Sequence, residues 1–138
     1  MEKKRSMNTH FLSAAALILC AAAIHSGLGE SWILRRLDPK NLPPTPFGGP
    51  AATHKILRAS WHLLTMVWLV LAAALVLSAS QPVDPRGQGV GLVIGAIFAT
   101  MGGGIVASSL LGNPRMLLRH PAWLFFLVIA ALAWAGCR

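Results

Sequence analysis

The sequence predicts an all-α membrane protein, arranged as an up-down bundle of four transmembrane helices. Apolar residues make up 55% of the chain and charged residues only 12%, whereas a soluble domain usually has about 25% charged residues. The charges divide the chain into four uncharged stretches, each long enough to cross a bilayer. This pattern excludes an ordinary soluble enzyme, a disordered tail and a coiled coil.

The first uncharged stretch lies between Arg5 and Glu30 and predicts a helix over residues 9–29. Basic residues precede it and small residues occupy positions 21–23, which is also the pattern of a cleaved signal peptide. The apolar run is long for a signal, so we expect a retained helix.

Three further stretches are bounded by arginine or aspartate and lack the alternation of barrel strands. They predict helices over residues 56–80, 88–112 and 121–137. Prolines and glycines crowd residues 30–55, so we expect an extended loop there within a single membrane domain, 1–138. The other connections are tight turns, which make consecutive helices antiparallel neighbours.

The basic residues are unequally divided between the two membrane faces. The N-terminal face has Lys3, Lys4, Arg5, Arg86 and Arg138. The opposite face has more, namely Arg35, Arg36, Lys40, Lys55, Arg58, Arg115 and Arg119. Because basic residues favour the cytoplasm, the count favours both termini outside. The cluster before the first helix argues for the reverse orientation, but translation from Met7 would remove that whole cluster.

The net charge of +8 would point to nucleic acid in a soluble protein. Here the charge flanks membrane spans, so we expect the bilayer and its anionic lipid head groups as partners and no nucleic acid.

Polar side chains within spans are costly and often mark function. His25 ends the first predicted helix, His62 begins the second and His120 precedes the fourth, all at the membrane face of the 30–55 loop. Glu30 lies at the same face. His25 and Glu30 would point about 140° apart on a continuous helix. We therefore expect Gly27 and Gly29 to end the helix, so that Glu30 turns back.

Imidazoles with a carboxylate suit a transition metal, and two facing histidines suit haem iron. The sequence thus nominates His25, His62, His120 and Glu30 as a metal or haem site, with Glu30 as ligand or as the group that orients a ligand. Two alternatives are helix-end hydrogen bonding, with Arg35, Arg58 or Arg119 paired to Glu30, and a proton or quinone site. No residue is nominated as catalytic.

Small residues recur at Gly87, Gly91 and Gly95 in the third predicted helix. This spacing lets helices approach closely, either within the bundle or in a homo-oligomer. Trp61 and Trp68 share one face of the second helix, and tryptophans near the helix ends are typical of an interfacial belt. Cys20 lies near the middle of the first predicted helix and Cys137 at the end of the fourth, so the two lie at different depths in the membrane and we expect no disulfide between them.

Residues 25–30, HSGLGE, and 57–62, LRASWH, resemble a group of small four-span bacterial membrane proteins of unknown function. The resemblance implies a bacterial inner-membrane protein with four helices and implies no activity. Small multidrug exporters need an acid in the middle of the first helix, but Ala15–Leu19 occupy that depth here. Quinone-linked thiol oxidoreductases need a cysteine pair, which this sequence lacks.

Three hypotheses for function follow. The first is a metal or haem site at one membrane face, the second a non-catalytic assembly or accessory subunit of a membrane complex, and the third a small proton-coupled carrier. The carrier ranks last because no titratable group lies deep in a span.

Overall fold

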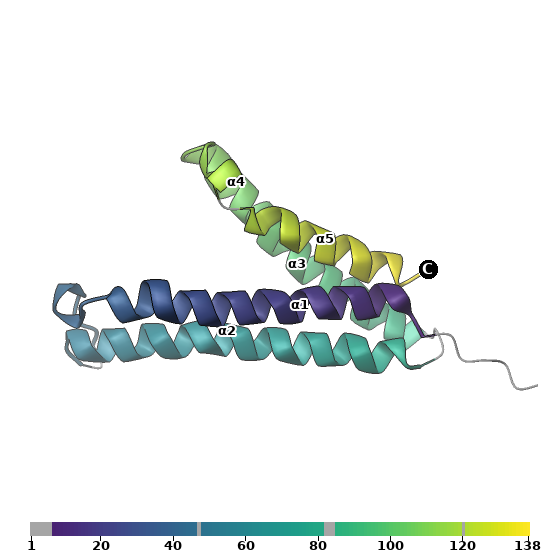
Figure 1. Cartoon of the computed structure of the whole chain (residues 1–138), viewed down its shortest axis with the longest axis horizontal. Helices are drawn as coiled ribbons and strands as arrows, with labels where there is room; N and C mark the ends of the chain where they lie inside the picture. Colours follow the sequence, from purple (N-terminus) through teal and green to yellow (C-terminus); the bar gives the residue numbers. More distant parts are fainter. Residues whose placement is uncertain (1–6, 47, 82–84, 120) are drawn as a thin grey trace, which may run out of the picture. The chain divides into compact units, whose positions relative to one another are not determined.

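The computed structural model describes residues 7–46, 48–81, 85–119 and 121–138, and its regular elements are helices. Three apolar helical segments are long enough to cross a membrane: Thr9–Arg36, Pro50–Ala79 and Pro85–Leu111. Ala122–Ala135 is a shorter apolar helix (Figure 1). These lengths confirm the prediction of an all-α, multi-pass membrane protein.

The first helix, α1 (Thr9–Leu28), ends as an α-helix between Gly27 and Gly29. It continues through a π-helical turn, Gly29–Ile33, and a short 3-10 turn, Leu34–Arg36. The α-helix therefore ends close to the predicted residue 29, but the chain stays helical beyond Gly27 and Gly29 and does not turn back there. Both glycines adopt helical conformations because their peptide groups keep hydrogen bonding along the helix, and the only glycine with positive φ among the described residues is Gly48.

The second helix, α2 (Pro50–Ala79), begins well before residue 56. Proline suits this first position, because its fixed φ is helical and its missing N–H would have no partner there. The connection from α1 contains one more 3-10 turn, Pro39–Asn41. The Asp38 carboxylate caps that turn by accepting the Lys40 N–H at 2.9 Å. The segment expected to be an extended loop is thus largely helical at both ends.

The chain divides into two compact units, Leu19–Val70 and a second unit formed by Met1–Ile18 with Leu71–Arg138. In the first unit, the end of α1 lies alongside the start of α2 (Figure 1). Buried positions on α2 recur at Thr65, Trp68, Ala72, Leu75 and Ala79. This spacing of three and four residues makes one continuous apolar stripe along the helix.

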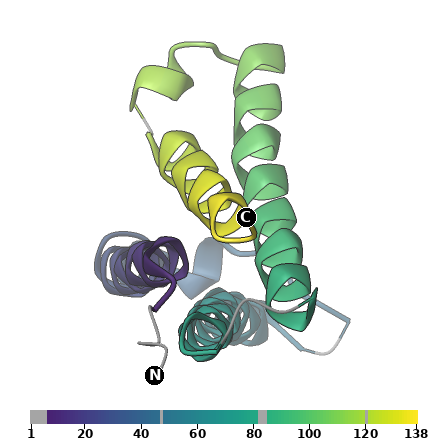
Figure 2. The same cartoon turned by 90° about the vertical axis from the view of Figure 1, so that its right-hand side faces the viewer.

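The second unit contains α3 (Pro85–Leu111), α4 (Met116–Arg119) and α5 (Ala122–Ala135). Figures 1 and 2 both show α5 lying alongside α3. Phe98 of α3 is fully buried and its ring lies 5.7 Å from that of Phe126. At 1.5 Å per residue, α3 rises about 40 Å and α5 only about 21 Å.

Candidate functional site: the Glu30 cluster

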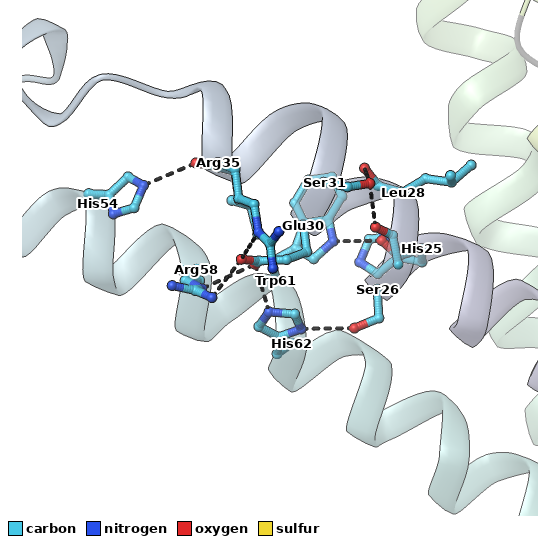
Figure 3. Close-up of polar contacts among 12 residues, drawn as sticks. His25, Ser26, Leu28, Glu30, Ser31, Arg35, His54, Arg58, Trp61 and His62 are labelled. Atoms are coloured by element: carbon cyan, nitrogen blue, oxygen red, sulfur yellow. Dashed lines mark hydrogen bonds and ion pairs between the residues drawn. The ribbon is translucent and has the colours of Figure 1, made fainter.

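A carboxylate in the π-helical turn is the centre of the polar contacts in the unit Leu19–Val70. The Glu30 side chain is only 14% exposed. Three side chains contact it, namely Arg35 from the following turn and Arg58 and His62 from α2 (Figure 3). We call these four residues, together with Ser26, the Glu30 cluster.

Arg58 makes the strongest contact with Glu30. Its Nη2 lies 2.5 Å from Oε1 and its Nε lies 3.1 Å from Oε2, so the guanidinium binds both carboxylate oxygens. Arg35 adds a weaker contact, with Nε 3.4 Å from Oε1. A bidentate, charge-assisted pair fixes geometry as well as charge. The negative charge of Glu30 is therefore compensated from both helical segments.

His62 connects Glu30 to Ser26. The Nε2 atom of His62 lies 3.2 Å from Oε2 of Glu30, and its Nδ1 atom lies 2.9 Å from the Ser26 hydroxyl. In the neutral ring with hydrogen on Nε2, His62 donates a hydrogen bond to the carboxylate, and its Nδ1 atom accepts a hydrogen bond from the Ser26 hydroxyl. Every polar atom of the imidazole then has a partner from α1 or from the turn that follows it.

Local helix geometry brings these groups together. Arg58 and His62 are four residues apart on α2, so they project from the same face. On the other side, the wide π turn changes the direction in which Glu30 leaves its helix. Glu30 was expected to turn back toward His25. It reaches across to α2 instead, because the continuing helix carries it past the end of α1.

His25 has a different environment. Its ring is stacked on Trp61, with centroids 4.4 Å apart and planes 3° apart, and it also meets Trp68 at 5.0 Å. The Trp61 indole N–H donates to the His25 carbonyl oxygen at 2.9 Å. The absence of a side chain on Gly29 makes this possible, since a Cβ there would overlap the Trp61 ring.

The structure therefore brings together two of the four nominated residues, Glu30 and His62. It places His25 nearby, against the indoles. His120 lies outside the described residues. Within the described ranges, no group of three or more His, Cys, Asp or Glu side chains is placed to hold a metal ion.

The nominated glycines lie in α3. Gly91 packs against Phe11 and Cys137, and Gly95 packs against Trp134, so closely that a Cβ at either position would overlap these side chains. Gly87 belongs to the first turn of the helix. The faces of Gly91 and Gly95 are thus covered within the chain. Cys20 and Cys137 are both free thiols.

Sequence reasoning did not assign Ser26 or the second role of Trp61. A single serine near the end of an apolar helix carries no motif, although it lies within the HSGLGE segment. Trp61 was interpreted as part of an interfacial belt. The adjacency of Trp61 to His62 was the available signal, because neighbouring residues on α2 contact neighbouring residues on α1, His25 and Ser26.

The order Ser26, His62, Glu30 invites comparison with a hydrolase triad, but the ring is reversed. In the triad the serine faces Nε2 and the acid faces Nδ1, whereas here Ser26 faces Nδ1 and Glu30 faces Nε2. Ser26 also lies inside α1, where backbone N–H groups bond along the helix and cannot stabilise an oxyanion. The arrangement favours binding between helices over catalysis.

The chain was compared with protein-family models, with curated proteins and with solved structures, and no match was found. The function must therefore be argued from the geometry of the chain itself.

Proposed function

We propose that this chain is a non-catalytic subunit of a membrane complex, in which the Glu30 cluster fastens α1 to α2. One observation carries the proposal: both ring nitrogens of His62 and both carboxylate oxygens of Glu30 are bonded to protein groups. A metal ligand needs a free lone pair, and Ser26, which bonds to His62, lies inside a helix without oxyanion donors. Here the lone pairs hold two helical segments together.

A subunit needs a surface for its partner, and α3 offers one. Ala96, Thr100, Gly103 and Ala107 are exposed and spaced by three or four residues, so they share one face. A Cβ at Gly103 or Gly104 would meet nothing within 4 Å. Small residues at this spacing let the backbone of a second membrane helix approach closely.

The setting of the subunit is part of the proposal. We place it in a bacterial inner membrane on its resemblance to small four-span proteins, with α5 completing an up-down bundle of four helices. The distribution of basic residues supports both termini outside. Exposed Arg36, Lys40 and Lys55 adjoin the apolar helices, where they suit the phosphates of anionic lipids.

A second candidate function, a metal or haem site, is favoured by the contact between Glu30 and His62. A carboxylate that holds one ring nitrogen of a histidine commonly orients the other nitrogen toward a metal. In this candidate, Nδ1 of His62 exchanges the Ser26 hydroxyl for the metal, and His25 supplies a further ligand.

The subunit hypothesis is tested by native mass spectrometry of the full chain extracted from its membrane in mild detergent. We expect a complex heavier than one chain, and we expect Gly103→Ile to dissociate it. Val70→Phe adds bulk at an exposed position of α2 and should leave the complex intact. A parent that is a single chain under all extraction conditions contradicts the hypothesis.

The two candidates are separated by elemental mass spectrometry and an absorption spectrum of the same preparation. A subunit of the proposed kind contains no stoichiometric iron, copper or zinc. Stoichiometric metal that is lost in His62→Ala, from protein that still inserts in the membrane, would establish the second candidate.

A further inference from the structure

Two buried polar atoms in the unit Leu19–Val70 have no hydrogen-bond partner among the described residues. They are Nε2 of His25 and Oγ1 of Thr65. Thr65 is only 7% exposed. Leaving a buried donor or acceptor without a partner destabilises a folded chain, so two such atoms in one small unit require an explanation.

The two atoms belong to one place in the fold. Trp61, Thr65 and Trp68 are separated by four and three residues on α2, so Thr65 lies between the two tryptophans on a shared face. The His25 ring contacts both indoles, at 4.4 and 5.0 Å. Because Thr65 shares the face of Trp61 and Trp68, the contacts of the His25 ring with both indoles place it on the same side of α2 as Thr65.

Thr65 also behaves unlike the other hydroxyl residues in the helices. Thr100 donates to the carbonyl of Ala96 at 2.9 Å, and Ser31 donates to that of Gly27 at 2.8 Å. This back-bonding is the usual way in which a hydroxyl is satisfied inside a helix. Thr65 makes no such bond, so its hydroxyl is available to a group outside its own helix.

We infer that a water molecule binds between α1 and α2, where it bridges Nε2 of His25 and Oγ1 of Thr65. Water fits because it donates and accepts at once, and a bound water with two or more polar partners is a normal component of a protein interior. It can arrive from the Glu30 end, where the His62 side chain is 35% exposed and hydrogen-bonds to Ser26, the neighbour of His25.

Trp61, Thr65 and Trp68, which are not part of the Glu30 cluster, would form this water site together with His25. The indoles of Trp61 and Trp68 enclose the imidazole, and Thr65 supplies the second hydrogen-bonding group. The water site lies farther from the membrane face than Glu30 does. His25 precedes Glu30 by five residues, and five residues of helix correspond to about 7.5 Å. The site therefore extends hydration from the membrane face into the apolar part of the unit.

The test is water-edited solid-state NMR of the full chain in lipid bilayers, with 15N-labelled histidine. The His25 signal is assigned by its disappearance in His25→Gln. We expect magnetisation to pass from water to Nε2 of His25, and we expect the transfer to be lost in Thr65→Val and kept in Thr65→Ser. A His25 signal that receives no magnetisation from water in the parent overturns the inference.

Unfolding in mixed detergent micelles gives a second readout. Thr65→Val keeps the shape of the side chain and removes its hydroxyl, so it should lower the unfolding midpoint, while Thr65→Ser lowers it less. If Thr65→Val is as stable as the parent, the hydroxyl has no partner and the inference is wrong. If Thr65→Val is destabilised while His25 stays isolated from water, the two side chains bond directly, and the water is again excluded.

Discussion

The imidazole of His25 lies flat against the indole of Trp61, with ring planes 3° apart and centroids 4.4 Å apart. The same indole donates its N–H to the His25 carbonyl oxygen. Trp61 therefore holds both the side chain and the backbone of one residue on α1. The neighbouring residues Ser26 and His62 repeat the pairing one position along each helix.

This close approach depends on Gly29, so we expect Gly29→Ala to destabilise the chain by about 1–3 kcal/mol, as overpacking usually does. The added Cβ would overlap the Trp61 ring. Gly27→Ala is the matched control, because a Cβ there meets nothing within 4 Å; it should stabilise the helix by up to about 1 kcal/mol. Unfolding in mixed micelles measures both changes, and equal effects of the two substitutions would contradict the packing described for Trp61.

Arg58 and Arg36 provide a test of the Glu30 cluster. Arg58→Gln removes the bidentate partner of Glu30, whereas Arg36 forms no ion pair with a described acidic residue. We expect Arg58→Gln to lower the unfolding midpoint and Arg36→Gln to leave it nearly unchanged. Because the Arg58 side chain is 52% exposed, salt should weaken the pair, and the difference between the variants should shrink at high ionic strength.

In the second unit, we expect Gly95→Ala to weaken the packing of α5 on α3 by about 1–3 kcal/mol. A Cβ on Gly95 would overlap the Trp134 indole. Gly104→Ala adds the same methyl group to the same helix, where it meets nothing within 4 Å, and should be neutral or mildly stabilising. The summed tryptophan emission, to which Trp134 contributes, should shift only in Gly95→Ala; a shift in both variants would show that the effect is not local.

The cysteines test the membrane arrangement. Cys20 lies on the surface of apolar α1 and Cys137 follows the end of α5. A maleimide that cannot cross membranes should label Cys137, and should label Cys20 only after the chain is dissolved in SDS, because the polar reagent does not enter the hydrocarbon around apolar α1. Labelling of Cys137 in intact cells would support both termini outside. Rapid labelling of Cys20 in bilayers would argue against α1 as a span.

The positions of the helices could be predicted because charges are excluded from membrane spans. Arg5 and Glu30 lie on either side of α1, whereas Arg86 lies in the first turn of α3 and Arg115 follows the end of that helix. The ends of the helices could be predicted less well. Residues 30–36 and 50–55 fall within the predicted loop because prolines and glycines crowd residues 39–50. A proline nevertheless begins α2, and helical structure is favoured in membrane segments because backbone hydrogen bonds must be satisfied within the chain.

The candidate site was predicted in part. Counting depth along the helices correctly brought Glu30 near His62, because both lie at the same end of their helices. Depth does not determine the direction in which a side chain points. The π turn at Gly29–Ile33 depends on packing against α2, and the stacking of His25 on Trp61 depends on the rotation of two helices about their axes. Neither has a signature in local sequence.

The unequal lengths of α3 and α5 have a consequence for the surrounding lipid. A helix of 14 residues rises about 21 Å, which is less than the hydrocarbon thickness of about 30 Å, while its neighbour α3 exceeds that thickness. Such hydrophobic mismatch is relieved by local thinning of the bilayer and by polar groups drawn inward beside the short helix. In the proposed four-helix arrangement, bilayer thickness would act on this chain asymmetrically, through the side on which α5 meets the lipid.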